Sequence, residues 1–407
     1  MDRLCPVPQD GNAASPSPTL GDVLRAFLSS VASQLKLGTR PLRVLRLLAA
    51  CGLPELGANI YRCLRCHKPH FGPRSCGDRH CPRCLVAKSW HWLHQQLASL
   101  LPISYYHGVF TLPQEIHGLV MLNPTRLYPL LFDCASQALL EFGRNRLGGD
   151  LGITAVLHTW GQQLNFHPHL HCIVTGGALR TDGQSWRSPK QRKFLFPVRA
   201  VAALFRGKFL YGLKEMLDGT EPLRLPEDCP KPGKARRAWF SQRYAQRWGV
   251  YAKRPFGGPE QVLGYLANYT HRVALSNRRI VALDKERQTV TFTYRDYRHG
   301  SQVKTLTLSA LEFIRRFSWH ILPAGLVRIR HYGILANNRR HRDIPRARTL
   351  LEQRPGRRRQ SKPVTVPPPR PPMRCPHCGH EALRWIGFLD AQGRTHLKAS
   401  VPICDSS

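Results

Sequence analysis

Acidic residues are scarce in this 407-residue chain: 25 Asp and Glu stand against 61 Lys and Arg, which gives a formal net charge of +36 at pH 7. A chain this basic favours a polyanionic partner, because it attracts the polyanion and gains free energy when counterions are released. A ribosome-like protein or one that adheres to membrane surfaces is the alternative. However, no Lys-rich amphipathic helix stands out, and the excess charge is spread along the chain. The composition therefore predicts a nucleic-acid partner.

Long hydrophobic runs are also missing. No window approaches the roughly 18 apolar residues that span a bilayer, and the first 20 residues hold no apolar segment typical of a secretory signal. The chain is therefore expected to be soluble and intracellular. Its 13 cysteines support this expectation, because the number is odd and five of them lie within residues 63–84. Such crowding is typical of metal sites in a reducing compartment rather than of disulfides.

Apolar periodicity predicts a mixture of helices and short strands. Helices are expected at 20–35, 41–52, 85–100, 125–147, 258–270 and 309–322. Strands are expected at 105–112, 152–160, 166–174, 278–283, 289–297 and 327–335, several of them in hairpins. Because no run of strand–helix–strand units occurs, the pattern predicts an α+β fold with an antiparallel sheet.

The first cysteine group predicts a zinc site. Two Cys-x-x-Cys pairs stand with fourteen residues between them, a separation that suits tetrahedral zinc. The expected ligands are Cys63, Cys66, Cys81 and Cys84, with Cys76 and His80 as alternatives. Four sulfur ligands leave no open position for water, so this zinc would be structural. A later pair, Cys375 and Cys378, is a candidate second zinc site that only His377, His380, His396 and Cys404 are nearby in sequence to complete.

Composition divides the chain into five segments. Residues 1–19 are rich in Pro, Ser, Gly and Asn and are expected to be disordered. A helical and zinc-binding N-terminal domain is expected at 20–100, and the sheet domain at 101–340. The Arg- and Pro-rich stretch 341–374 is expected to be a linker or a solvated basic arm, followed by a small C-terminal segment at 375–407.

Three histidines alternate in the stretch FHPHLHC at 166–172. In a strand, alternate side chains share a face, so His167, His169 and His171 would lie together and could hold a divalent metal. Hydrogen-bonded surface histidines are the alternative. Pro168 cannot donate a ladder hydrogen bond, which indicates an edge or the start of a strand. Because no HExxH motif or nearby acidic base accompanies these histidines, phosphoryl transfer fits better than zinc hydrolysis.

Two tyrosines are candidates for the nucleophile of such a reaction. Tyr265 and Tyr269 are four residues apart in the expected helix at 258–270, so they share one face of it. Packing in a core is the alternative role for both. Phosphate-binding side chains follow them in sequence and favour a site, and the candidates for DNA binding are Arg272, Arg278 and Arg279.

These motifs together resemble a known family. HPHLHCIVTGG resembles the His-hydrophobic-His motif of the HUH single-strand nucleases, and YLANYTHRVALSNRR resembles the tyrosine motif of the rolling-circle transposases of the insertion-sequence family numbered ninety-one. CLRC…SCGDRHCPRC resembles that family's zinc-binding domain, and GVFTLP at 108–113 resembles the first strand of the HUH domain. The matches run in the family's order from about 60 to 340.

The resemblance implies a fold, a reaction and a set of site residues. The fold would be an HUH-type antiparallel sheet flanked by helices. His169 and His171 would hold Mg²⁺ or Mn²⁺, with His167 and Asn268 as candidates for a third ligand. Tyr269, or Tyr265 as the second nucleophile, would attack single-stranded DNA at an element end and form a 5′-phosphotyrosine. Such a transposase would work in the bacterial cytoplasm, associated with the nucleoid.

Two other functions share part of this pattern. A non-catalytic zinc protein would bind DNA without cleaving it, although such a protein needs neither the three histidines nor the two tyrosines. A replication initiator or relaxase would share the HUH chemistry, and only the zinc-domain resemblance separates it from a transposase.

Overall fold

The computed structural model describes residues 17–85, 99–189, 195–253, 262, 273–297, 299–353 and 373–398. Its largest sheet has five antiparallel strands in the order β13-β5-β6-β3-β9. These strands are β3 (Tyr105–Thr111), β5 (Gly152–Trp160), β6 (Phe166–Thr175), β9 (Val250–Lys253) and β13 (Ile329–Gly333). The expected α+β fold with an antiparallel sheet is confirmed.

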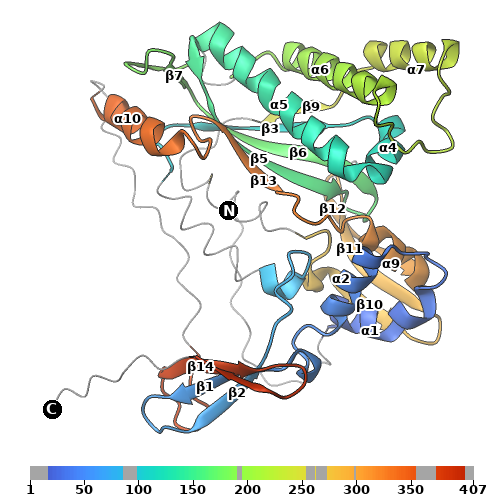
Figure 1. Cartoon of the computed structure of the whole chain (residues 1–407), viewed down its shortest axis with the longest axis vertical. Coiled ribbons are helices and arrows are strands. Elements are labelled where there is room, and N and C mark those ends of the chain that lie inside the picture. The colour runs from blue at the N-terminus through green and yellow to red at the C-terminus, as the bar shows by residue number, and fades with distance from the viewer. Residues whose placement is uncertain are drawn as a thin grey trace.

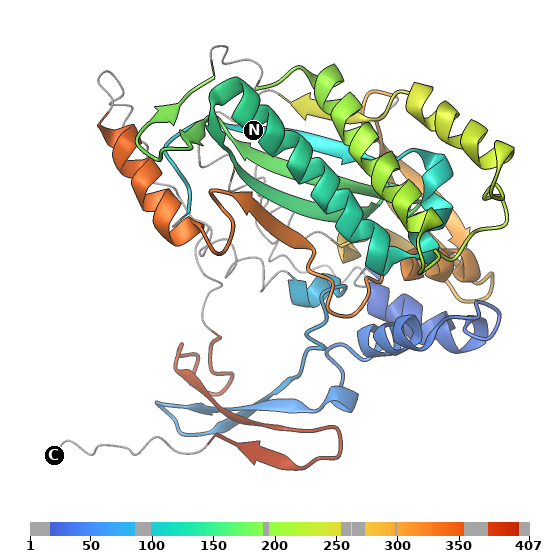
Figure 2. The same cartoon turned by 45° about the horizontal axis from the view of Figure 1, so that its top comes forward.

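Helices cover one face of this sheet, as Figures 1 and 2 show. They are α4 (His117–Leu122), α5 (Pro124–Leu147) and α6 (Val198–Asp218), and α7 (Lys234–Ala245) packs against α6. Alternate residues of β6, namely Leu170, Cys172 and Val174, are buried in the core beneath them. Each such aliphatic side chain contributes about 1.5–3 kcal/mol when it is fully buried. The histidines of β6 therefore occupy the face turned away from these helices.

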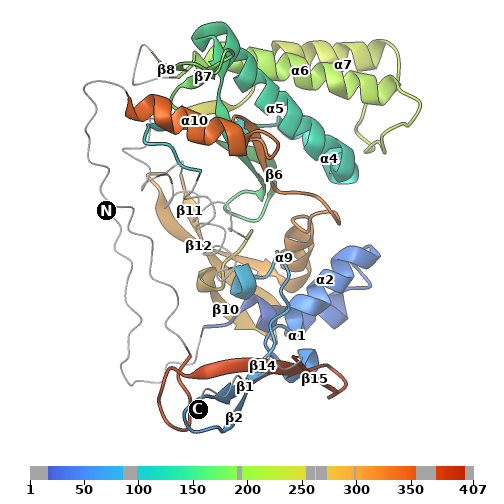
Figure 3. The same cartoon turned by 60° about the vertical axis from the view of Figure 1, so that its left-hand side comes forward.

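A second core joins the N-terminal helices to a three-stranded sheet from the later part of the chain. Figure 3 shows these elements side by side. They are α1 (Leu20–Val31), α2 (Thr39–Ala49), α9 (Ala310–Ser318), β10 (Ile280–Asp284), β11 (Thr289–Asp296) and β12 (Gln302–Ser309). Leu24, Leu45 and Phe313 are among the fully buried residues that hold the two parts together.

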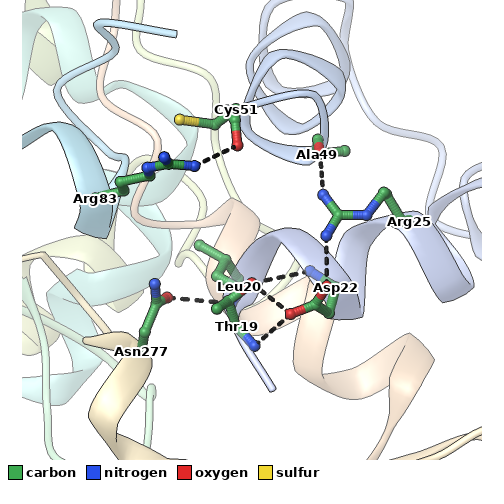
Figure 4. A network of polar contacts seen from close by, with 8 residues as sticks. All are labelled: Thr19, Leu20, Asp22, Arg25, Ala49, Cys51, Arg83 and Asn277. Atoms are coloured by element: carbon green, nitrogen blue, oxygen red, sulfur yellow. Dashed lines mark hydrogen bonds and ion pairs between the residues drawn. The ribbon is translucent and has the colours of Figure 1, made fainter. Parts of the chain in front are cut away.

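The start of α1 is fixed by its own cap and by a distant residue (Figure 4). The Thr19 hydroxyl accepts the backbone N–H of Asp22 at 3.2 Å, and the Asp22 carboxylate accepts the Thr19 N–H at 2.7 Å. The N–H of Leu20 donates to the side-chain oxygen of Asn277 at 3.1 Å. Asn277 opens the short 3-10 helix η3 (Asn277–Arg279), so α1 is anchored to the last residues of the predicted tyrosine motif.

A small sheet combines strands from both ends of the described chain. Its order is β15-β14-β1-β2, and it lies apart from the five-stranded sheet in Figures 1 and 2. The strands are β1 (Ala58–Cys63), β2 (Pro69–Pro73), β14 (Leu383–Leu389) and β15 (Thr395–Leu397). Because β14 pairs with β1 from end to end, the expected C-terminal segment is part of one unit with the N-terminal cysteine region.

The remaining elements are short or lie at the margin of the main sheet. They are β4 (Gly149–Asp150), β7 (Ala178–Arg180), β8 (Trp186–Arg187), α10 (Arg340–Glu352) and the 3-10 helices η1 (Pro54–Leu56) and η2 (Gln114–Ile116). Among the described helices, none is both long enough and apolar enough to cross a membrane.

One expectation needs correction. The stretch after 340 is not a linker at its start, because α10 buries Ile344, Ala347 and Leu351 at helical spacing between its arginines. Pro168 is near the start of β6, one of the two placements expected for it, although β6 lies between β5 and β3 and is not an edge strand. A bulge lies at this point of β6, where His167 and Pro168 together stand against the single residue Thr159 of β5. The expected helices at 85–100 and 258–270 lie largely outside the described residues.

Candidate active site and cysteine clusters

Three histidines converge on the face of the five-stranded sheet that is turned away from α4, α5 and α6. His158 of β5 is directly opposite His169 of β6, and His171 is two residues farther along β6. One ligand nitrogen from each ring lies within 4.8 Å of the other two, and Nε2 of His169 is 3.1 Å from Nε2 of His171. Neighbouring strands therefore bring three imidazoles to one point on a rigid element.

Hydrogen bonds on the far side of two rings orient them, and one of these bonds fixes the tautomer of His169. Nδ1 of His169 is 2.7 Å from the carbonyl oxygen of His167, so this nitrogen carries the proton and Nε2 carries the lone pair. Nδ1 of His171 is 2.9 Å from Nε2 of His107, a buried residue of β3. When Nε2 of His107 accepts a hydrogen bond from Nδ1 of His171, the proton of the His171 ring is on Nδ1. The lone pair on Nε2 of His171 then also points toward the shared point. Two lone pairs facing each other at 3.1 Å suit a bound cation, and such outer partners are typical of metal-binding histidines.

Burial keeps His169 in the neutral form that a metal ligand requires. The side chain of His169 is buried, and burial together with the neighbouring His167 lowers its pKa to about 4. His158 is 3% exposed, and its ring stacks on Trp160 with centroids 4.5 Å apart.

The third histidine of the cluster differs from the two predicted candidates. The ring of His167 does not join the cluster; it lies near His117, with centroids 5.8 Å apart, while its carbonyl orients His169. Asn268 lies outside the described residues. Neither His158 nor His107 was among the site residues predicted from the sequence. Both lie in expected strands, so the alternation of side chains across paired strands is the signal that could have found them.

The predicted tyrosines, Tyr265 and Tyr269, and the predicted DNA contact Arg272 also lie outside the described residues. Val262 is the nearest described residue before them; it is helical, fully buried and part of a core that includes Ile173. Ile173 follows His171 by two residues on β6 and so shares its face.

The two described arginines of the predicted DNA-binding set differ in their contacts. Arg278 is exposed. Arg279 donates to the backbone carbonyls of Thr293 at 2.7 Å and of Gln162. Its guanidinium also lies over Phe292, 5.5 Å from the ring centroid. Arg279 therefore holds the segment after η3 against β11, and little of its donor capacity remains for a phosphate.

Eight of the described cysteines come together in two groups of four, whose members differ from those expected for the first zinc site and the candidate second site. The first group brings together Cys51, Cys76, Cys81 and Cys84. Cys51 was not predicted, whereas Cys76 was an alternative. The other alternative, His80, is not a ligand here, because its Nδ1 lies 2.7 Å from the Asp78 carboxylate and its Nε2 accepts the Leu322 N–H at 3.0 Å.

The second group closes the small sheet. Cys63 and Cys66 meet Cys375 and Cys378, so the predicted second pair is completed by the first pair and not by a nearby histidine. The distances are 3.6 Å from Cys63 Sγ to Cys378 Sγ and 3.7 Å from Cys66 Sγ to Cys375 Sγ. A site of this kind clips together residues more than 300 positions apart in the sequence.

Both groups have the dimensions of a zinc tetrahedron. Zinc–sulfur bonds of about 2.3 Å imply sulfur–sulfur distances of about 3.8 Å. The sulfur–sulfur distances in the first group are 3.5–3.6 Å, close to this value. Backbone N–H groups point at the sulfur atoms, and the N–H of Cys66 lowers the pKa of the Cys63 thiol to about 6. A hydrogen bond from Cys76 lowers the pKa of Cys81 to about 5. Thiolates are the form that binds metal.

Two family models match this chain. Residues 23–112 match a family described as "Transposase zinc-binding domain", and residues 152–342 match one described as "Putative transposase". The first match contains the first cysteine group and half of the second, and the second contains the three clustered histidines.

Two relatives extend the similarity to most of the chain. "Putative transposase y4qJ" of Sinorhizobium fredii is 41% identical over 343 residues, which cover 83% of this chain and 85% of the relative. "Transposase for insertion sequence element IS801" of Pseudomonas savastanoi pv. phaseolicola is 28% identical over 294 residues, covering 71% of this chain and 68% of the relative.

Among solved structures, the conjugative relaxase TrwC is slightly similar. In its metal-free complex with OriT DNA it is 16% identical, with a TM-score of 0.23, and the match covers 30% of this chain and 46% of that one. In its complex with a 27-mer DNA it is 15% identical, with a TM-score of 0.23 and coverage of 66% and 92%. The matches along the sequence are far stronger than these, and by them the chain belongs to the IS91 family of transposases.

Proposed function

We propose that this transposase cleaves and rejoins single-stranded DNA at the ends of a mobile element through a 5′-phosphotyrosine intermediate. One observation carries the proposal: the Nε2 atoms of His169 and His171 face each other at 3.1 Å, with His158 beside them and with both rings oriented by hydrogen bonds from behind. Such a pocket of lone pairs suits a divalent cation. A non-catalytic DNA-binding protein would not need it.

The donor set limits the choice of metal. Among the described residues the cluster offers three imidazoles and no carboxylate, which favours a transition-metal ion such as Mn²⁺ over Mg²⁺, because Mg²⁺ prefers oxygen ligands. When bound, the ion would polarise the scissile phosphate and offset its developing negative charge. His107 and the His167 carbonyl would hold the rings in the orientation that binding requires.

A tyrosine would supply the nucleophile. The hydroxyl oxygen of Tyr269 forms a bond to phosphorus, the bond from phosphorus to the 3′ oxygen breaks, and that oxygen leaves as a 3′-OH with a proton. The 5′-phosphotyrosine retains the phosphodiester bond energy, so a free 3′-OH can later attack it and release the tyrosine. Tyr265 would serve a second strand transfer.

Two structural zinc ions complete the proposed set of cofactors. Each cysteine group offers four sulfur ligands at tetrahedral spacing, which leaves no open position for catalysis. Residues at about 101–340 would then form the catalytic domain, and segments before and after it in the sequence would form the zinc-binding part of the protein. The basic chain, with a net charge of +36, would bind DNA as its partner.

Covalent capture of DNA tests the proposal. The chain is incubated with Mn²⁺ and an end-labelled single-stranded oligonucleotide that carries an element end, and a labelled band that survives denaturation is measured. We expect the adduct with the wild-type chain and its loss in His158→Ala and in Tyr265→Phe/Tyr269→Phe. The control is His331→Gln, since His331 bonds to Thr154 outside the cluster. An adduct that persists in the double tyrosine variant would rule out the proposed nucleophiles.

A further inference from the structure

The small sheet has a row of aromatic rings that neither proposed zinc site nor the histidine cluster uses. Directly opposed residues of paired strands share a face, and the pairings are Tyr61 with His70, Tyr61 with Trp385, and Phe388 with His396. These five rings therefore lie on one face, with at least one ring from each of the four strands. The other face carries different residues, among them Phe71, which is opposite Ile60.

The rings are arranged in contacts that keep them in place but leave them accessible. Phe388 stacks on His396 with centroids 4.6 Å apart and planes 15° apart, and the Arg74 guanidinium lies 4.1 Å from the centre of the Phe388 ring. The indole N–H of Trp385 points to the side-chain oxygen of Asn59 at 3.4 Å. Trp385 is 42% exposed, and none of the five rings belongs to a hydrophobic core of the described chain. These rings are therefore not core residues.

The surroundings of this face are positively charged. Arg374 and Arg394 are paired with Glu381 and Asp390. Three further cations near this face form no ion pair within the described part of the chain: Arg65 and Lys68 in the turn between β1 and β2, and Arg74 beside Phe388. A zinc ion with four thiolates carries a net charge of −2, which three unpaired cations exceed. Arg62 follows Tyr61 by one residue and Arg384 precedes Trp385 by one residue, so both arginines lie on the reverse face of the sheet.

We propose that the aromatic face of the β15-β14-β1-β2 sheet is a second DNA-binding site, on which unpaired bases of a single strand stack while the surrounding cations contact its phosphates. Exposed rings on a sheet suit bases of any sequence, because every base has a flat π face, and the cations match the phosphate charge. The ligand rests on the proposed function, in which the chain handles single-stranded DNA. The sheet lies apart from the histidine cluster, so it would hold a part of the strand that is not being cut (Figure 1).

Binding of a labelled oligothymidylate of about 20 nucleotides to the full chain tests this site. Fluorescence anisotropy is measured at one fixed salt concentration without added Mg²⁺ or Mn²⁺, so that cleavage does not contribute. Loss of a stacked base contact weakens binding roughly 5- to 150-fold. For oligothymidylate, we expect the Kd of Trp385→Ala and of Tyr61→Ala to be at least about fivefold higher than that of the wild type, with partial recovery in Trp385→Phe. For a duplex or an abasic strand, the same variants should bind with the Kd of the wild type.

Phe71→Ala is the matched control, because Phe71 is 54% exposed on the reverse face of the same sheet. Zinc content, measured for each variant, shows that the module is folded. Equal affinities of Trp385→Ala and Phe71→Ala for oligothymidylate would overturn the proposal. It would also be overturned if Trp385→Ala weakened binding to the abasic strand as much as binding to oligothymidylate. Loss of self-association in sedimentation, with DNA binding intact, would instead make this face an interface between copies. If the wild-type chain binds DNA through these rings but forms no covalent adduct, the proposed function fails and the second site stands.

Discussion

Replacing His107 should weaken the metal site without touching a ligand. Its Nε2 is 2.9 Å from Nδ1 of His171, and its ring lies parallel to that of His171 with centroids 5.2 Å apart. His107→Phe keeps the stacked ring but removes the acceptor, which leaves a buried N–H without a partner at a cost of about 1–3 kcal/mol. Loss of an outer partner typically lowers metal affinity about 10- to 100-fold, in agreement with this range.

The assay is the yield of covalent DNA adduct as a function of Mn²⁺ concentration. The midpoint should rise about 10- to 100-fold in His107→Phe, while the yield at saturating Mn²⁺ stays near that of the wild type. His107→Gln offers an acceptor oxygen again and should recover part of the affinity. An unchanged midpoint in His107→Phe would refute the view that His107 sets the tautomer of His171. A lower yield at every Mn²⁺ concentration would point to a different role for His107.

Three further predictions concern composition and stability. The purified chain should contain two zinc ions by elemental mass spectrometry, falling to one in Cys378→Ser and staying at two in Cys172→Ser, because Cys172 lies in the sheet core outside both groups. Leu45→Ala should lower the free energy of unfolding by about 2–5 kcal/mol in denaturant titration, because Leu45 is fully buried. Although burial raises the pKa of Asp150, hydrogen bonds from arginines including Arg339 lower it overall. The stability that Asp150 contributes should therefore be present above its usual pKa of 3.8, be lost as the pH falls below it, and be absent in Asp150→Asn.

The strands that carry the histidines could be predicted because their sequence is locally consistent. Alternation in FHPHLHC assigned His169 and His171 to one face, and the hairpin that includes His158 was expected as well. What alternation could not supply was the register of that hairpin. The pairing of Trp160 with Phe166, continued without a bulge, would place His158 opposite Pro168. The bulge shifts the strand by one residue, and only then does His158 meet His169.

The grouping of the cysteine pairs could not be predicted from their spacing in the sequence. Spacing predicted that these cysteines gather in clusters of four, but it favoured grouping the pairs that are neighbours in sequence. In the structure the neighbours separate: Cys63 and Cys66 join a pair near the C-terminus, and Cys81 and Cys84 join Cys51 and Cys76. Contacts across some 300 residues depend on the path of the whole chain, which local spacing does not encode.

The helix α10 was not predicted, because its sequence is dense in arginine. In α10 the residues Ile344, Ala347 and Leu351 recur at helical spacing, but they stand among arginines, in a stretch that resembles a solvated arm in composition. Their burial against the sheet decides the conformation, since tertiary packing of a short apolar stripe stabilises a helix more than its composition does.

Locating the DNA adduct within the chain tests the central claim most directly. After reaction with Mn²⁺ and a single-stranded element end, the chain is digested by a protease and by a nuclease, and the peptides are analysed by mass spectrometry. The account predicts a nucleotide bound through phosphate to Tyr269 or Tyr265, formed only when Mn²⁺ is present and absent in His158→Ala. A nucleotide on any other residue, or cleavage of the strand with no covalent peptide, would contradict it.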